Sequence, residues 1–136
     1  MTGEAARVLV VDDHELNLKL LQRVLELGGH DVLTASSLGA AEEMLTRQLP
    51  ALIVLDLQLP DGDGLDLARR LKATPQTASC VILACTAEAM QGDAERALAA
   101  GCDAYVSKPI DTREFSALVD ELLRRAAPAP APEEAV

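Results

Sequence analysis

The stretch Ala51-Leu-Ile-Val-Leu-Asp56-Leu-Gln-Leu-Pro60-Asp-Gly-Asp-Gly64 decides the predicted fold of this 136-residue chain. Residues 51–55 are aliphatic on both faces, which is typical of a strand buried inside a parallel sheet. The Pro, Gly and Asp residues that follow favour a turn. Asp56 therefore stands at the carboxyl end of a buried strand, where open α/β sheets bind their ligands.

Four further aliphatic segments alternate with amphipathic ones along the chain. The aliphatic runs predict strands at residues 7–11, 31–35, 80–84 and 103–106. Helical spacing of apolar residues predicts helices at residues 15–27, 38–49, 65–73, 93–100 and from 112 onward. Because every connection is long enough for a crossover, we expect an α/β fold with five parallel strands and helices on both faces of the sheet.

Local signals mark the ends of several helices. Ser37 is a suitable N-cap for the second helix, and Pro50 is expected to end that helix after Leu49. The segment Asp111-Thr-Arg-Glu114 resembles a capping box at the start of the last helix. That helix is expected to bury one apolar face, formed by Phe115, Leu118, Val119 and Leu122.

Composition and charge argue against several classes of function. The chain carries a net charge of −10 and no basic patch, which argues against direct nucleic-acid binding. No apolar run approaches the ~20 residues that a membrane span needs. The N-terminus lacks the pattern of a secretory signal. We therefore expect a soluble, cytoplasmic protein that does not insert into a membrane.

Cysteine usage and the C-terminal composition bear on domain organisation. Cys80, Cys85 and Cys102 form no CxxC pair and are expected to be small, buried and reduced. Residues 126–136 are rich in Pro and Ala and are expected to form a disordered tail. This leaves one predicted domain, at residues 6–125.

Acidic residues follow the first and third predicted strands. Asp12 and Asp13 come directly after residues 7–11, and such a pair often only caps the next helix. If Asp56 lies on a neighbouring strand, three carboxylates share a small volume, and their mutual repulsion favours a bound cation. Hard oxygen ligands favour Mg²⁺ over zinc. The adjacent His14 is expected to be a surface residue rather than a ligand.

A hydroxyl group and an amine follow the last two predicted strands. Thr86 and Lys108 would each be ordinary turn or surface residues if considered alone. Together they place a hydrogen-bond donor and a cation beside the carboxylates, which suits a phosphoryl group. Asp56 could accept that group as an acyl phosphate. The sequence alone does not choose between the cis and trans forms of the Lys108–Pro109 bond.

Four motifs occur in a characteristic order: Val-Val-Asp12-Asp13, Leu-Asp56-Leu-Gln-Leu-Pro60 with Gly64, Ala-Cys-Thr86-Ala87 and Tyr105-Val-Ser-Lys108-Pro109. In order and spacing they resemble the receiver domain of response regulators in bacterial two-component systems, over about residues 6–125. The resemblance implies a flavodoxin-like (CheY-like), three-layer, doubly wound (βα)5 fold. Residues 13–21 and 86–93 are similar to the DivK type of single-domain response regulator, and such segments also occur in receivers fused to hybrid kinases.

The resemblance implies which residues hold the phosphoryl group and the metal ion. Asp56 matches the phosphorylated aspartate of the family. Asp12 and Asp13 match the acidic pair that holds Mg²⁺, together with Asp56 and the backbone carbonyl of Gln58. Leu59 stands where Met is usual in the family, and this apolar exchange is expected to be harmless.

The resemblance also implies which residues respond to phosphorylation. Thr86 matches the switch hydroxyl, and Lys108 and the backbone amide of Ala87 match groups that contact the phosphoryl oxygens. Pro109 matches the proline of the family's cis peptide. Tyr105 matches the aromatic residue that moves inward when Thr86 moves toward the phosphate. Two positions that tune dephosphorylation are occupied by Gln58 and Glu88.

The implied function is that of a phosphoacceptor in two-component signalling. The donor is a phosphohistidine of a histidine kinase or a histidine phosphotransfer protein. The reader is a protein partner that contacts the face built from the fourth helix, the fifth strand and the fifth helix. The domain would phosphorylate and dephosphorylate itself, with no turnover of small substrates, as a monomer or a phosphorylation-dependent dimer.

Three alternatives are weaker. A haloacid-dehalogenase-like phosphatase needs a second acid at the position of Gln58, and a flavodoxin-like cofactor binder needs a phosphate-cradling loop where Asp12 and Asp13 stand. The chain could also be the receiver module of a larger DNA-binding response regulator or hybrid histidine kinase. A stand-alone receiver is the preferred expectation, because little sequence follows the predicted domain.

Overall fold

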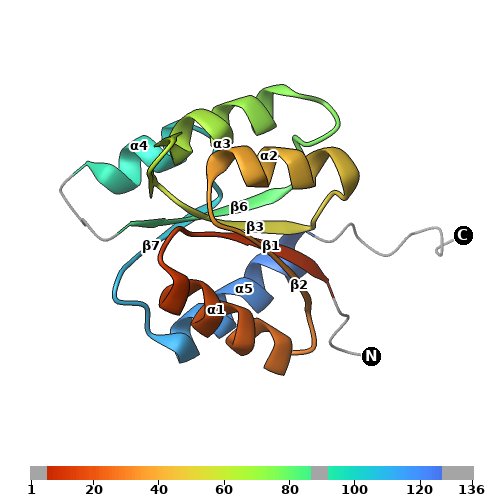
Figure 1. Ribbon diagram of the computed structural model, residues 1–136, viewed down its shortest axis with the longest axis vertical. Coiled ribbons are helices and arrows are strands. Elements are labelled where there is room, and N and C mark those ends of the chain that lie inside the picture. The colour runs from red at the N-terminus through yellow and green to blue at the C-terminus, as the bar shows by residue number, and fades with distance from the viewer. Residues whose placement is uncertain (1–5, 87–91, 127–136) are drawn as a thin grey trace, which may run out of the picture.

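Five aliphatic segments form one parallel sheet in the computed structural model, which describes residues 6–86 and 92–126 (Figure 1). The strands are β1 (Arg7–Val11), β2 (Asp31–Ala35), β3 (Leu52–Asp56), β6 (Val81–Thr86) and β7 (Ala104–Ser107). They lie side by side in the order β2-β1-β3-β6-β7, and every neighbouring pair is parallel. Strand β3 is therefore central, which agrees with the burial of all of its residues.

Helices cover both faces of the sheet and complete a three-layer, doubly wound fold. They are α1 (Glu15–Leu27), α2 (Leu38–Arg47), α3 (Gly64–Ala73), α4 (Asp93–Ala99) and α5 (Thr112–Ala126). Helices α1 and α5 lie on one face, and α2, α3 and α4 lie on the other (Figure 1). The predicted fold class is confirmed.

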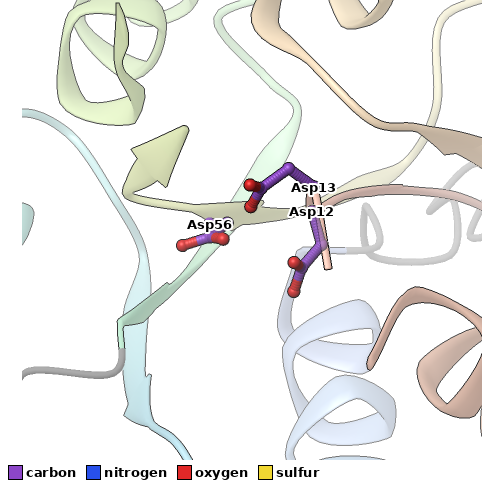
Figure 2. Close-up of side chains that lie close together, drawn as sticks. All are labelled: Asp12, Asp13 and Asp56. Carbon is purple, nitrogen blue, oxygen red and sulfur yellow. The ribbon is translucent and has the colours of Figure 1, made fainter. Parts of the chain in front are cut away.

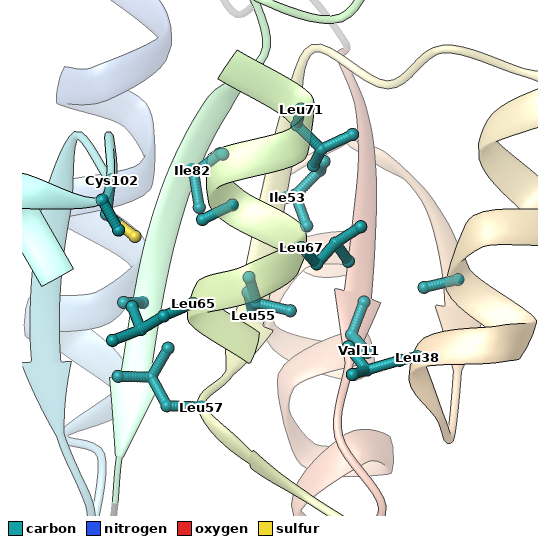
Figure 3. Close-up of a cluster of buried hydrophobic side chains, with 14 of the residues drawn as sticks. Val11, Leu38, Ile53, Leu55, Leu57, Leu65, Leu67, Leu71, Ile82 and Cys102 are labelled. Atoms are coloured by element: carbon teal, nitrogen blue, oxygen red, sulfur yellow. The ribbon is translucent and has the colours of Figure 1, made fainter. Parts of the chain in front are cut away.

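The two faces of the sheet bury two separate hydrophobic clusters, because side chains alternate along each strand. In β3, Ile53 and Leu55 belong to the cluster under α2, α3 and α4, part of which is shown in Figure 3. Leu52 and Val54 point to the other face, where Phe115 of α5 is 1% exposed. The apolar face predicted for α5 packs there as expected.

Side-chain caps begin two helices at the predicted positions. The hydroxyl of Ser37 accepts a hydrogen bond from the backbone N–H of Ala40, 3.1 Å away. The carboxylate of Asp111 accepts hydrogen bonds from the N–H groups of Arg113 and Glu114, at 2.9 and 3.1 Å. Each cap satisfies N–H groups that have no partner within the helix.

Several predicted element boundaries differ from the observed ones by one or two residues. Helix α2 ends at Arg47, and Leu49 is 47% exposed instead of lying on the buried face. The residue before a proline is disfavoured in the helical region, so Pro50 ends the helix earlier than the apolar spacing suggested. Strand β6 extends to Thr86 instead of residue 84, and β7 begins and ends one residue later than predicted, because ladder pairing with neighbouring strands sets both boundaries.

The predicted turn after β3 contains a short antiparallel hairpin. Its strands are β4 (Gln58–Leu59) and β5 (Gly62–Asp63). Gln58 pairs with Asp63, and Leu59 pairs with Gly62. Strands of two residues are too short to show an alternating pattern of apolar and polar residues. The sequence therefore predicted the turn but not the two strands.

The prediction that the three cysteines, Cys80, Cys85 and Cys102, are free and buried is confirmed. Burial raises the pKa of the Cys85 thiol to about 12, so this thiol stays protonated near neutral pH. Among residues 6–86 and 92–126, no helix is both long and apolar enough to cross a bilayer. Residues 127–136 of the predicted tail lie outside the described part of the chain.

Candidate functional site

The carboxyl ends of four neighbouring strands bring the predicted site residues together. Asp12 directly follows β1, and Asp56 is the last residue of β3. Thr86 is the last residue of β6, and Lys108 directly follows β7. Because these strands are adjacent and parallel, their carboxyl ends lie at one edge of the sheet, as the sequence predicted.

Three carboxylates form a compact acidic cluster at this edge. One oxygen of each of Asp12, Asp13 and Asp56 lies within 4.8 Å of the others (Figure 2). Asp12 and Asp56 are only 2% and 4% exposed, whereas Asp13 is exposed to solvent. Two carboxylates of the cluster are therefore buried, and the third makes the cluster accessible to a ligand from solvent.

The Lys108 ammonium group lies between the two buried carboxylates. Its Nζ atom is 3.1 Å from Oδ2 of Asp12 and 3.3 Å from Oδ2 of Asp56. The backbone N–H of Lys108 also donates to the carbonyl of Thr86, at 2.8 Å. The Lys108–Pro109 peptide bond is cis, as the family resemblance implied.

Backbone and amide donors hold the carboxylates in place. Oδ1 of Asp56 accepts from the N–H of Gln58 at 3.0 Å, and Oδ1 of Asp12 accepts from the N–H of His14 at 2.8 Å. The side-chain amide of Asn17 donates to Oδ2 of Asp12. This role of Asn17 was not predicted, because nothing in the local sequence distinguishes it from an ordinary polar residue of α1.

The electrostatic balance of the site favours a bound cation. Burial raises the pKa of Asp56, and the nearby charge of Asp12 adds to this effect, while the Gln58 N–H and Lys108 oppose it. Burial lowers the pKa of Lys108, but its hydrogen bond to Asp12 and the charge of Asp56 outweigh burial and raise the pKa overall. Lys108 is therefore charged at neutral pH. It contacts two of the three carboxylates of the cluster and supplies one positive charge.

The donor set fits Mg²⁺. All three side chains of the cluster supply hard carboxylate oxygens, and Mg²⁺ accepts two or three such ligands while it keeps several waters. His14 is exposed and does not belong to the cluster, as expected. The side chains alone therefore provide a sufficient set for this ion, and no soft ligand of the kind that zinc prefers is part of the cluster.

The remaining predicted site residues are placed only in part. Thr86 is 2% exposed, and Tyr105 of β7 is half-buried and packs against the cluster under α2, α3 and α4. Gln58 is exposed on β4. Ala87 and Glu88 lie outside the described residues.

Comparisons with known proteins point to one family. The family model described as a response regulator receiver domain matches residues 8–120. The chain is 38% identical over 108 residues to the polar-differentiation response regulator DivK of Brucella ovis, and this region is 79% of the chain and 88% of that relative.

Solved structures with the same fold include receivers from different contexts. A two-component response regulator from Clostridium difficile is 26% identical with a TM-score of 0.84, covering 92% of this chain and 100% of that one. The signal receiver domain of a signal transduction histidine kinase from Syntrophus aciditrophicus is 26% identical with a TM-score of 0.84, covering 93% and 96%.

Proposed function

Because the chain belongs to the response regulator receiver domain family, we propose that Asp56 accepts a phosphoryl group from a phosphohistidine of a sensor histidine kinase or histidine phosphotransfer protein. The observation that carries this proposal is the environment of Asp56. It is a buried carboxylate at the end of the central strand, and a lysine and two further carboxylates lie around it. This combination supports a nucleophile that works on a highly charged group.

The transfer exchanges one bond to phosphorus for another. A carboxylate oxygen of Asp56 attacks the phosphorus, a P–O bond forms, and the P–N bond to the donor imidazole breaks. The electron pair stays on the imidazole nitrogen, which takes up a proton. Lys108 compensates the charge of the phosphoryl oxygens, and the Thr86 hydroxyl and the backbone amide of Ala87 donate hydrogen bonds to them.

Mg²⁺ is the cofactor that fits this site. Asp12, Asp13 and Asp56 would hold the ion, together with the backbone carbonyl of Gln58. When bound, it would neutralise the carboxylates and the phosphoryl oxygens, which otherwise repel one another. Lys108 offsets part of the carboxylate charge through its contacts with Asp12 and Asp56.

Phosphorylation adds about two negative charges at the end of β3. We expect Thr86 and Lys108 to move toward these charges, and the half-buried Tyr105 to move inward behind Thr86. The surface built from α4, β7 and α5 would then change, and a partner protein would bind one of its two states. This is a shift of populations between two conformations of one fold.

The signal would end by hydrolysis of the acyl phosphate at the same site. Gln58 and Glu88 occupy the two positions proposed to tune this rate. Gln58 is exposed at the start of the hairpin beside Asp56, where its side chain can reach incoming water. The chain would therefore catalyse its own phosphorylation and dephosphorylation.

We propose that the domain acts as a stand-alone cytoplasmic regulator whose output is a protein contact. Its DivK relative is covered for 88% of its length, which supports this arrangement. The alternative is a receiver within a larger DNA-binding regulator or hybrid kinase, and the similar receiver of a histidine kinase supports it. The active form would be a monomer or a phosphorylation-dependent dimer.

Incubation with acetyl phosphate and Mg²⁺ tests the phosphoacceptor. We expect intact-mass analysis to show one added phosphoryl group, which hydroxylamine removes as expected for an acyl phosphate. The Asp56→Asn variant should gain none, and chelation of the metal should abolish labelling of the parent. Equal labelling of Asp56→Asn, or no labelling of the parent, would refute the proposal.

A further inference from the structure

Asp61, in the turn between β4 and β5, caps a helix that is distant in sequence. Its Oδ1 atom accepts a hydrogen bond from the backbone N–H of Leu38 at 3.0 Å, and its Oδ2 atom accepts from that of Gly39 at 3.1 Å. These are the first two residues of α2. The carboxylate therefore binds the N-terminus of α2 with both of its oxygens.

This contact fits the charge at the start of the helix. The first N–H groups of a helix lack internal partners and carry partial positive charge. Ser37 already satisfies the N–H of Ala40, so Asp61 supplies acceptors for two other donors. The hydrogen bonds from Leu38 and Gly39 lower the pKa of Asp61 below its ordinary value of 3.8, so it is ionised at neutral pH.

Apolar packing reinforces the polar contact. A Cβ atom added to Gly62 would lie 2.7 Å from Cδ1 of Leu38, so the β4–β5 hairpin lies directly against the first residue of α2. Leu38 is itself buried in the hydrophobic cluster under α2, α3 and α4. The hairpin is thus fixed to a rigid element by two hydrogen bonds and a close contact.

The same hairpin carries part of the acidic site. It begins at Gln58, whose N–H donates to Oδ1 of Asp56. Gln58 pairs with Asp63 of β5, so the orientation of the hairpin determines that of Gln58. On the other side of the site, the N–H of Asp12 donates to the carbonyl of Ala35, two residues before Ser37. The β2–α2 junction therefore contacts both halves of the site.

We propose that Asp61 is a positioning residue of the cation site. By fixing the hairpin to α2, it holds the backbone of Gln58 against Asp56, so that the Gln58 carbonyl is preorganised as a ligand. The inference rests on the proposed function, because it assumes that Asp12, Asp13, Asp56 and Gln58 bind Mg²⁺. Loss of the Asp61 carboxylate should reduce the free energy of Mg²⁺ binding by more than it reduces the free energy of unfolding.

The test compares two caps of the same helix in the full chain. Asp61→Ala removes the acceptors that join α2 to the hairpin, whereas Ser37→Ala removes a cap whose hydrogen bond is made to Ala40 within α2. With Mg²⁺ alone as titrant in calorimetry, we expect Asp61→Ala to bind about tenfold more weakly, as for other supporting contacts of metal ligands. Ser37→Ala should bind like the parent, and Asp61→Asn, which keeps one acceptor oxygen, should lie in between.

Amide hydrogen exchange of the metal-free variants gives a second readout. We expect Asp61→Ala to accelerate exchange at Gly64, whose N–H donates to Leu57 at the base of the hairpin, while Ser37→Ala leaves it unchanged. If Asp61→Ala bound Mg²⁺ as tightly as the parent, or if Ser37→Ala lost as much Mg²⁺ affinity as Asp61→Ala, the role of Asp61 would be refuted but the proposed metal site would stand. A parent that binds no Mg²⁺ would overturn the proposed metal site as well.

Discussion

At the scale of single residues, the lowered pKa of Asp61 predicts how stability depends on pH. A carboxylate with a folded-state pKa below its unfolded value stabilises the fold above the unfolded pKa, and this contribution is lost as pH falls through the folded pKa. The difference in unfolding free energy between the parent and Asp61→Ala should therefore be constant near neutral pH. It should shrink once pH falls below about 4.

Urea unfolding at a series of pH values measures this difference. Ser37→Ala is the control, because a hydroxyl group does not titrate in this range and its effect should not change with pH. A difference for Asp61→Ala that stayed constant down to the acid transition would mean that the charge of Asp61 does not act on α2.

Site residues that directly follow a strand could be predicted from the sequence. Residues whose role depends on a contact with another element could not. Asp12, Asp56, Thr86 and Lys108 each follow an aliphatic run, so their meeting follows from the parallel sheet alone. The partner of Asn17 is set by the rotation of α1, and the partners of Asp61 lie more than twenty residues away in sequence. Such contacts leave no periodic signal.

At the scale of elements, the junction of β3 and α3 depends on a glycine without a side chain. A Cβ atom at Gly64 would lie 2.6 Å from the carbonyl oxygen of Asp56 and 3.1 Å from Cα of Leu57. Both are backbone atoms, so the obstacle cannot rotate away. We predict that Gly64→Ala lowers the unfolding free energy by about 2 kcal/mol, as overpacking of a tight contact does.

Gly39→Ala is the matched control for this prediction. Gly39 also lies in the first turn of a helix, but its added Cβ would meet only Oδ2 of Asp61, at an ordinary 3.7 Å. Alanine should be neutral there or stabilise α2 by about 0.5 kcal/mol, because it restricts the unfolded chain. Denaturant unfolding measures both variants, and an equal loss in the two would contradict the role given to Gly64.

Helices and strands were predicted best where buried apolar residues recur at regular spacing along the sequence. All five sheet strands were expected within two residues of their observed ends. The inner strands β1, β3 and β6 are mostly aliphatic because they are buried on both faces, whereas the edge strands β2 and β7 are only partly buried and were recognised from shorter apolar runs. The end of α2 and the β4–β5 hairpin were missed. The backbone preference before Pro50 ended the helix in spite of the apolar spacing, and the hairpin is held by Asp61 and by its own short ladder.

At the scale of the whole molecule, binding of an ion at the proposed metal site should stabilise the entire fold. Its acidic edge is built from the ends of the same strands that form both hydrophobic clusters. An ion that binds only the folded chain therefore stabilises all of it, by about 2.7 kcal/mol at a concentration a hundredfold above Kd. We predict that Mg²⁺ raises the unfolding free energy of the parent in this way.

In Asp13→Asn, Mg²⁺ should raise the unfolding free energy much less than in the parent, because the variant lacks an exposed ligand and one of the cluster's three charges. The metal-free variant should be at least as stable as the metal-free parent, since like charges in the cluster repel one another. Glu26→Gln, an equal charge change at the far end of α1, should respond to Mg²⁺ like the parent. Urea unfolding with and without Mg²⁺ distinguishes these cases. If Asp13→Asn kept the full gain, the stabilising ion would bind elsewhere on the molecule.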